Sequence, residues 1–133
     1  MKLVKPDDPI LHRVCRPDFT IDGDDIQTMF RLLAETDGLG LAAPQVGIDG
    51  RLFVTEWGEV FVNPVFTRLG DPLVFHEGCL SFPGRLCARL RHPAVRMADG
   101  RVYEGLKAIV IQHEADHLDG ICITDPLPEA NHA

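Results

Sequence analysis

The sequence lacks an excess of basic residues and any long apolar segment. Its 133 residues include 13 Lys and Arg against 20 Asp and Glu, giving a formal net charge of −7. A protein that binds nucleic acid usually presents a basic face to the phosphates, so direct nucleic-acid binding is not expected. No apolar run approaches the ~20 residues of a membrane span, and the first residues lack the apolar centre of a signal peptide. We therefore expect no association with a membrane.

Cysteine is also scarce, and its spacing excludes a dense disulfide framework. The four cysteines, Cys15, Cys79, Cys87 and Cys122, include no CxxC pair, which weakens the case for a structural zinc site. Such usage is typical of a protein kept in a reducing cytoplasm. A hydrophobic content of 45% is enough for a substantial core at this length, so we expect residues 1–133 to form a single domain.

Hydrophobic periodicity and turn residues predict a chain of mixed helix and strand. Asp24 and Asp25 can cap a helix that extends to about residue 36, with Gly38 as its C-terminal stop. The small-residue segment 38–47 looks too irregular for a helix or a strand. Short apolar or alternating segments then predict strands near 51–55, 60–66, 73–75, 86–91, 95–97, 101–104 and 121–124, with tight turns at 57–58 and 99–100.

A second helix is expected from about Gly105 to Gly120, and it carries the run Gln-His-Glu-Ala-Asp-His at positions 112–117. His113 and His117 are four residues apart, so both side chains lie on one helical face, near enough to bind a single metal ion. Glu114 follows the first histidine and can transfer protons in metal-assisted hydrolysis. Metal-assisted hydrolysis is therefore the leading interpretation.

Two histidines leave such a site incomplete, because catalytic zinc-type sites use three protein ligands and one open position. In the extended pattern His-Glu-x-x-His-x-x-Gly-x-x-His, the third histidine position holds Ile123, and only residues 118–133 follow His117. An upstream ligand is favoured, and Cys79 stands out because Gly78 lets the backbone turn sharply or approach closely beside it. A thiolate with two imidazoles would leave one tetrahedral position open.

Three motifs together resemble a known family. Gly-Leu-Gly-Leu-Ala-Ala-Pro-Gln at 38–45, Glu-Gly-Cys-Leu-Ser at 77–81 and the run at 112–117 resemble, in order and spacing, the signature motifs of peptide deformylase. The resemblance extends from about Leu3 to Thr124. It implies an α+β fold in which antiparallel strands surround a central helix that carries the His-Glu-x-x-His motif. It also implies hydrolytic removal of the N-formyl group from the N-terminal formylmethionine of nascent polypeptides, with release of formate.

The resemblance assigns roles to individual residues by position. Cys79, His113 and His117 would bind one divalent metal ion, Fe²⁺ in the cell, with Zn²⁺, Ni²⁺ or Co²⁺ able to occupy the same site. Glu114 would take a proton from the attacking water and deliver it to the leaving amine. The Gln45 side-chain amide and the Leu80 backbone N–H would donate hydrogen bonds to the formyl oxygen.

Other positions match the substrate-binding and supporting residues of the family. Backbone groups of Leu39 and Gly40 would pair with the substrate in a β-like manner. The methionine side chain would enter an apolar pocket formed partly by Leu106, Ile109 and Val110. Glu77 and Arg91 match a pair that supports the strand leading to the Cys79 ligand.

The resemblance also implies partners and a location. N-formylmethionyl peptides and nascent chains are the expected substrates of a monomer that works in the cytoplasm, which is the host cytoplasm if a phage encodes it. Many bacterial deformylases dock at the ribosome exit region through a C-terminal helix. This sequence shows no matching segment and resembles compact, phage-type deformylases, so we expect at most a transient ribosome contact.

Two alternatives remain open at this point. The first is a small zinc peptidase, which needs a third ligand downstream of His117. The second is a non-catalytic metal module in which Cys87 or Cys122 closes the coordination shell, so that the chain folds on metal and hydrolyses nothing. Glu114 and Gln45 argue against the second alternative, because a structural site uses neither.

Overall fold

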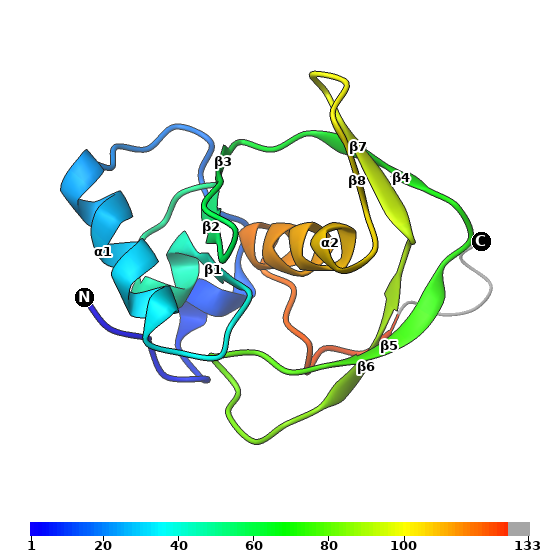
Figure 1. Ribbon diagram of the computed structural model, residues 1–133. Coiled ribbons are helices and arrows are strands. Elements are labelled where there is room, and N and C mark those ends of the chain that lie inside the picture. The colour runs from blue at the N-terminus through cyan, green and yellow to red at the C-terminus, as the bar shows by residue number, and fades with distance from the viewer. Residues whose placement is uncertain (128–133) are drawn as a thin grey trace.

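The computed structural model describes residues 1–127, and a single helix, α2 (Leu106–Leu118), lies at its centre with strands on several sides (Figure 1). Buried residues occupy nearly every side of this helix: Ala108, Val110, Ile111, Gln112, Glu114, Ala115, His117 and Leu118. The α+β class predicted from the sequence is confirmed. None of the helices within residues 1–127 combines the length and apolar composition needed to cross a membrane.

The strands of residues 1–127 form three small antiparallel sheets. The first sheet has the strand order β1 (Gly40–Ala42), β2 (Leu52–Thr55), β3 (Val60–Val62). The second has the order β4 (Phe66–Leu69), β7 (Ala94–Met97), β8 (Val102–Glu104). The third pairs β5 (Leu73–Glu77) with β6 (Cys87–Arg91). The predicted turns at 57–58 and 99–100 connect β2 to β3 and β7 to β8, and both pairs are antiparallel. Four of the five strand pairs within residues 1–127 join strands that follow one another in the chain, and only β4 and β7 pair across a longer interval.

Three hydrophobic clusters hold these sheets to the helices. The first packs α2 against the first two sheets through Ala42, Phe53, Phe61, Val95, Met97, Ala108, Ile111 and Leu118. The second packs α1 (Gly23–Ala34) on β1 and β2 through Met29, Leu33, Leu41, Leu52 and Val54. The third joins the short 3₁₀ helix η1 (Pro9–His12) to the segment after α2 through Ile10, Leu11, Phe82, Cys122 and Ile123. Each fully buried large side chain contributes about 1.5–3 kcal/mol of hydrophobic free energy.

Helix α1 begins earlier than the sequence predicted. Its N-cap is Asp22, whose Oδ1 accepts a hydrogen bond from the Asp25 backbone N–H at 2.8 Å. Asp24 and Asp25 lie in the first turn instead, where their negative charges favour the positive end of the helix dipole. The helix ends at Ala34, before the predicted stop at Gly38. The cap prediction was wrong by two residues because Asp22, Asp24 and Asp25 lie close together and each can accept this hydrogen bond.

The prediction that segment 38–47 is irregular was also wrong. It contains strand β1 and the 3₁₀ helix η2 (Ala43–Val46), because Leu41 pairs with Val54 of β2 and the Gln45 side chain accepts a hydrogen bond from the Ala42 N–H at 2.8 Å. The pairing of β1 with β2 depends on a segment farther along the chain, which the local sequence pattern does not reveal.

The structure also differs from the prediction for two strands. The segment 60–66 divides into β3 and the start of β4, with Asn63 between them in the left-handed region (φ 46°). Segment 121–124 contains no strand. It forms a turn in which the Asp125 N–H donates to the Cys122 carbonyl at 3.0 Å and Asp125 Oδ2 accepts from the Cys122 N–H at 2.9 Å.

Gly120 closes the C-terminal end of α2 and tolerates no side chain. Its φ is +73°, and a Cβ placed on it would lie 2.6 Å from the Arg13 backbone nitrogen. We expect Gly120→Ala to lower the free energy of unfolding by about 3 kcal/mol or more, because backbone cannot move aside as a side chain can. Gly58→Ala is the matched control, since Gly58 has φ +91° and no atom within 4 Å. Urea unfolding should give only about 1–2 kcal/mol for that control.

Candidate metal centre

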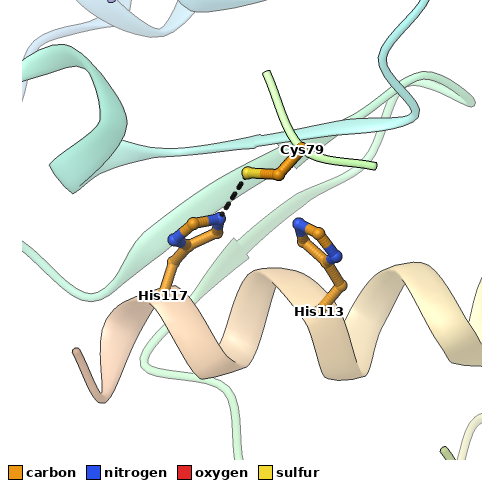
Figure 2. Close-up of side chains that lie close together, drawn as sticks. All are labelled: Cys79, His113 and His117. Atoms are coloured by element: carbon orange, nitrogen blue, oxygen red, sulfur yellow. Dashed lines mark hydrogen bonds between the residues drawn. The ribbon is translucent and has the colours of Figure 1, made fainter. Parts of the chain in front are cut away.

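Three side chains converge beside α2 (Figure 2). One ligand atom each from Cys79, His113 and His117 lies within 4.8 Å of the others, and no other such group of His, Cys, Asp or Glu occurs among residues 1–127. The histidines come from consecutive turns of α2, with ring centroids 5.2 Å apart. Cys79 lies just after β5, and its Sγ is 3.3 Å from His117 Nε2. The three residues predicted as ligands are therefore neighbours in space.

The chemistry and orientation of this donor set fit a divalent cation. Glu77 Oε1 lies 2.8 Å from His113 Nδ1, so this nitrogen donates to the carboxylate and Nε2, once deprotonated, is the nitrogen that can bind a cation. Metal-binding histidines usually donate their second ring N–H to a carboxylate or carbonyl in this way. One thiolate with two imidazoles suits Zn²⁺, Fe²⁺, Co²⁺ or Ni²⁺.

The two alternative ligand sets do not gather at this centre. Cys87 and Cys122 are outside the group of three, and Cys122 Sγ instead donates to the Leu11 carbonyl at 3.3 Å. No carboxylate or histidine from residues 118–127 joins the histidine pair either. Within the described residues, the geometry therefore favours the upstream cysteine over a downstream ligand or a second thiolate.

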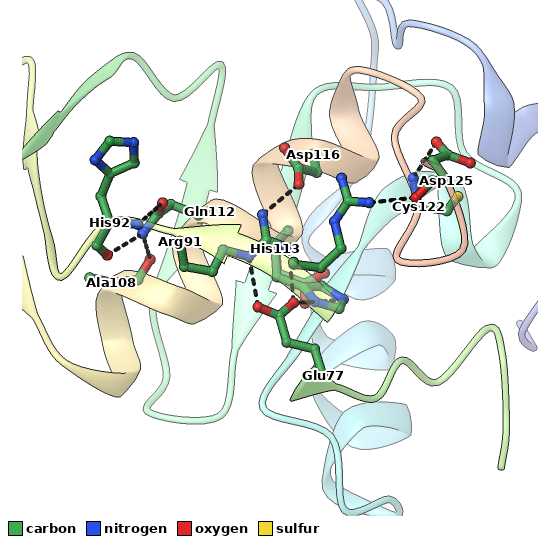
Figure 3. Close-up of polar contacts among 11 residues, drawn as sticks. Glu77, Arg91, His92, Ala108, Gln112, His113, Asp116, Cys122 and Asp125 are labelled. Atoms are coloured by element: carbon green, nitrogen blue, oxygen red, sulfur yellow. Dashed lines mark hydrogen bonds and ion pairs between the residues drawn. The ribbon is translucent and has the colours of Figure 1, made fainter. Parts of the chain in front are cut away.

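An ion-pair network connects the His113 ring to β6 and α2 (Figure 3). The Arg91 guanidinium on β6 donates through Nε and Nη2 to Glu77 at 2.7 and 2.8 Å, and through Nη1 to Asp116 of α2 at 2.6 Å. Burial raises the pKa of Glu77, but hydrogen bonds from Arg91 and His113 outweigh it and lower the pKa to about 2. Glu77 is therefore a carboxylate that holds both β6 and the His113 ring.

The sequence anticipated a Glu77–Arg91 pair but not its extension to Asp116. It also gave no role to Gln112, whose buried amide bonds the backbone N–H and carbonyl of His92, both at 2.9 Å, and the Ala108 carbonyl at 3.0 Å (Figure 3). This amide attaches the junction of β6 and β7 to α2. The sequence contains one indication of these roles, which is that Gln112 and Asp116 both lie within the 112–117 motif.

Gln45 connects the β1–η2 segment to the residues after Cys79. Its Nε2 donates to Ser81 Oγ at 3.0 Å and lies 3.6 Å from Cys79 Sγ, and its side chain is 1% exposed. Sequence reasoning assigned no role to Ser81. The serine hydroxyl fixes the Gln45 amide beside the metal centre, which is where a donor to a substrate oxygen would have to lie.

Glu114 is a buried residue of α2, and its side chain lies against Gly40 of β1. Its Oε2 is 3.9 Å from His113 Nε2, and its buried Oε1 has no hydrogen-bond partner among residues 1–127. Burial, partly offset by the positive charges of His113 and Arg91, raises the pKa of Glu114 to about 7. A carboxyl group with a pKa near neutrality can both accept and release a proton at working pH.

The absence of a side chain at Gly40 makes room for Glu114. A Cβ on Gly40 would lie 2.7 Å from Glu114 Cγ and 2.8 Å from Oε2. The motif at 38–45 thus shapes the surroundings of the motif at 112–117, although 74 positions separate Gly40 from Glu114 in the sequence (114 − 40).

The predicted catalytic and substrate-binding residues line one cavity of about 660 Å³. Its walls include Leu39, Gly40, Gln45, Cys79, Leu80, Leu106, Ile109, Val110, His113 and Glu114. His117 lies deeper and is 1% exposed. Clefts of ~300–1,000 Å³ are typical of sites that bind small molecules, so one cavity brings together a candidate metal centre, a candidate proton-transfer group and apolar walls.

Arg91 should be important for stability as well as for the site. We expect Arg91→Met to lower the free energy of unfolding by about 3–5 kcal/mol, because it leaves the buried Glu77 carboxylate and the partly buried Asp116 carboxylate without their guanidinium partner. The matched control is Arg68→Met, since Arg68 is exposed and lies over the Phe66 ring. Urea unfolding of that control should change by about 0.5 kcal/mol or less. Equal stability of the two variants would contradict the role given to the network.

Comparison with known proteins places this geometry in a family. The model of the family described as Polypeptide deformylase matches residues 1–133. The peptide deformylase of Hahella chejuensis is 39% identical over 145 aligned residues, which cover 96% of this chain and 86% of the relative.

Solved structures agree with the sequence comparisons. The crystal structure of the Thermotoga maritima peptide deformylase superposes with a TM-score of 0.80 at 33% identity, covering 96% of this chain and 97% of that one. The PDF of the Vibrio parahaemolyticus bacteriophage VP16T, crystallised with actinonin, gives a TM-score of 0.79 at 33% identity, with coverage of 92% and 99%. Similarity therefore extends over nearly the whole length of both structures.

Proposed function

The chain belongs to the polypeptide deformylase family, and from that membership we propose how its own residues carry out the reaction. It is a hydrolase that removes the N-formyl group from nascent polypeptides and releases formate. The observation that supports a division of roles among its residues is the convergence of Cys79, His113 and Glu114 on one cavity, with His117 directly behind it. We interpret residues 1–133 as a single catalytic domain, since α2 contributes to both its core and its site.

In this proposal Cys79, His113 and His117 bind one divalent cation, which is Fe²⁺ in the cell, with Zn²⁺, Ni²⁺ or Co²⁺ able to replace it. When bound, the cation supplies Lewis acidity that makes hydroxide available near neutral pH. Burial lowers the pKa of His113, but Glu114, Cys79 and Glu77 outweigh it and raise the pKa, so binding of the cation must displace a proton from this ring.

Glu114 moves the protons of the reaction. Its Oε1, which has no partner among residues 1–127, accepts a proton from the attacking water. As the bond between the formyl carbon and the nitrogen breaks, Glu114 returns this proton to the departing amine, and the oxygen of water ends in formate. A positioned acid–base group of this kind contributes about 10²–10⁴-fold to a rate.

Gln45 and Leu80 stabilise the charge that develops on the formyl oxygen. The Gln45 amide donates to Ser81 Oγ at 3.0 Å, which orients the group, and its longer contact of 3.6 Å to Cys79 Sγ is the one that the formyl oxygen would replace. The Leu80 backbone N–H supplies the other donor, and Leu80 lines the same cavity. Donors held in place before the reaction need no reorganisation, which is why each is worth about 10²–10³-fold.

Substrate selection follows from the cavity walls. The methionine side chain packs against Leu106, Ile109 and Val110 on α2, while the backbone of Leu39 and Gly40 pairs with the peptide. The substrates are N-formylmethionyl peptides and nascent chains, met by a monomer in the cytoplasm through at most transient contact with the ribosome. A formyl group carries only hydrogen on its carbon, so a narrow approach to Glu114 excludes larger acyl groups.

Release of formate tests this function directly. The protein, purified without oxygen and loaded with Fe²⁺ or Ni²⁺, is incubated with formyl-Met-Ser-Ser and, in parallel, with acetyl-Met-Ser-Ser. Turnover of the formyl peptide alone is expected. Folded, loaded protein that releases no formate would contradict the proposal, and cleavage of the Met-Ser bond would favour a peptidase.

Cys79→Ala tests the ligand set. After dialysis against buffer without metal, we expect the variant to retain far less cation than the wild type, because loss of the thiolate leaves only two protein ligands. Cys87→Ala is the matched control, since Cys87 is a neighbouring cysteine outside the group of three. Atomic absorption gives the metal content of both variants. Full retention by Cys79→Ala would point to a ligand downstream of His117.

A further inference from the structure

One partly exposed carboxylate binds three side chains to which the proposed reaction gives no role. Glu59 Oε1 accepts a hydrogen bond from Trp57 Nε1 at 2.6 Å, and Glu59 Oε2 accepts one from Arg101 Nη1 at 2.7 Å. The Tyr103 hydroxyl lies 2.7 and 2.9 Å from the same two oxygens. Burial raises the pKa of Glu59, but hydrogen bonds from Tyr103 and Trp57 outweigh it and lower the pKa. We call Trp57, Glu59, Arg101 and Tyr103 the Glu59 cluster.

The Glu59 cluster joins two of the sheets. Trp57 and Glu59 belong to the connection between β2 and β3, whereas Arg101 and Tyr103 belong to the β7–β8 hairpin. Their hydrogen bonds therefore span 42 and 44 positions of the sequence. The Tyr103 ring also lies 6.4 Å from the Trp57 ring and 5.9 Å from the Phe61 ring, measured between centroids. Charge-assisted hydrogen bonds and ring contacts from two sheets thus fix the orientation of the Trp57 indole.

The fixed indole ring lies beside the first turn of α2. Lys107 Nζ is 5.2 Å from the centroid of the Trp57 ring, which is within the distance of a cation–π contact. The turn lacks the usual supports, because its N-cap is Gly105, no side chain caps it and it contains no acidic residue. A lysine at this end is unfavourable to the helix dipole. The Trp57 ring therefore offsets the charge of Lys107 at a helix end that has no cap.

The same turn forms part of the proposed methionine pocket. Leu106 is the first residue of α2, is 61% exposed, and lines the cavity together with Ile109 and Val110. The Ile109 N–H closes the turn by donating to the Gly105 carbonyl at 3.2 Å. Opening of the turn would move Leu106 away from the pocket, whereas Glu114 lies about two turns farther along the helix. Disorder here should therefore weaken binding of the methionine side chain without altering proton transfer.

We propose that Glu59 is a positioning residue for the methionine pocket: by fixing the Trp57 ring, it keeps the first turn of α2, and with it Leu106, in place before the substrate binds. This inference rests on the proposed function, because the pocket is the one that binds the side chain of formylmethionine. A wall that is ordered in advance binds more tightly, since the substrate need not supply the free energy that orders it. Glu59 does not line the cavity and acts only through other residues.

The kinetic test compares formyl-Met-Ser-Ser with formyl-Ala-Ser-Ser, whose single methyl group gains little from the pocket. In Glu59→Ala, we expect KM for the methionine peptide to rise about three- to tenfold, which corresponds to the loss of one cation–π contact. Both kcat and the KM of the alanine peptide should stay within about twofold of wild type, because the loss is one of side-chain binding. Trp57→Leu should give the same pattern. Glu59→Gln keeps the size and one acceptor oxygen, so its KM should lie between those of wild type and Glu59→Ala.

Hydrogen exchange gives a readout that needs no substrate. By NMR, we expect the Ile109 amide of Glu59→Ala to exchange about three- to tenfold faster than that of wild type, because the first turn opens more often. The Leu118 amide, at the other end of α2, should exchange as in wild type. An equal acceleration at Leu118 would report general destabilisation and would overturn the proposal.

Glu56→Ala is the matched control, because Glu56 is an exposed glutamate of the same connection and lies outside the Glu59 cluster. It should leave both KM values and the exchange of Ile109 unchanged. An equal rise in KM for both peptides in Glu59→Ala, a loss of kcat at unchanged KM, or unchanged exchange at Ile109 would overturn the proposal. Failure of the proposed function itself is distinct, because no peptide would then yield formate while the exchange of Ile109 would still respond.

Discussion

Glu114→Gln is expected to lower kcat/KM for a formylmethionyl peptide by about 10²–10⁴-fold while the cation remains bound. Glutamine preserves the size of the side chain but can neither accept a proton from water nor pass one to the departing amine. The three residues proposed as ligands are unchanged in this variant. Formate release under single-turnover conditions, together with the metal content of the same preparation, measures both parts of the expectation.

The control for this variant is Glu56→Gln, which removes the charge of an exposed glutamate between β2 and β3. It should keep wild-type activity, so that a loss in Glu114→Gln reflects position and not net charge. Near-normal turnover by Glu114→Gln with a full complement of metal would show that another group handles the protons. Loss of metal from the variant would instead assign Glu114 to the stability of the centre.

The parts of the site that the sequence predicted are those set by local geometry. Four-residue spacing on a helix necessarily places His113 and His117 on one face, whatever surrounds the helix. The third ligand is different, because Cys79 approaches from a separate strand segment and 34 positions separate it from His113 (113 − 79). Residue chemistry alone favoured Cys79 without deciding among the cysteines, and the family resemblance supplied the assignment.

The parts that the sequence missed depend on partners far along the chain. Asp116 bonds Arg91 across 25 positions, Gln112 bonds His92 across 20, and Gln45 bonds Ser81 across 36. A polar residue within a helix is most often solvent-exposed, so sequence patterning gives no reason to bury these groups. Strand β1 escaped prediction for a related reason, since its order comes from pairing with β2.

Gly40→Ala should abolish most of the activity without removing the cation. The new methyl group would lie 2.7–2.9 Å from Cγ, Oε2 and Cδ of Glu114, closer than real Cβ contacts allow, so the carboxylate must move. A displacement of about 1 Å at a reacting group can cost about 10²-fold in rate. We therefore expect kcat/KM to fall by about 10²-fold, with metal content and melting temperature close to wild type. Gly23→Ala is the matched control, because a Cβ on Gly23 meets nothing within 4 Å.

A double-mutant cycle separates this effect from simple obstruction of the substrate. If the Gly40→Ala methyl group acts by displacing the Glu114 carboxylate, it should cost little in a Glu114→Ala background, where no carboxylate remains to be displaced. The two losses would then be strongly non-additive, as expected of residues in direct contact. Additive losses would mean that the methyl group blocks the peptide itself. In that case Gly40 would make room for the substrate backbone and not for the Glu114 carboxylate.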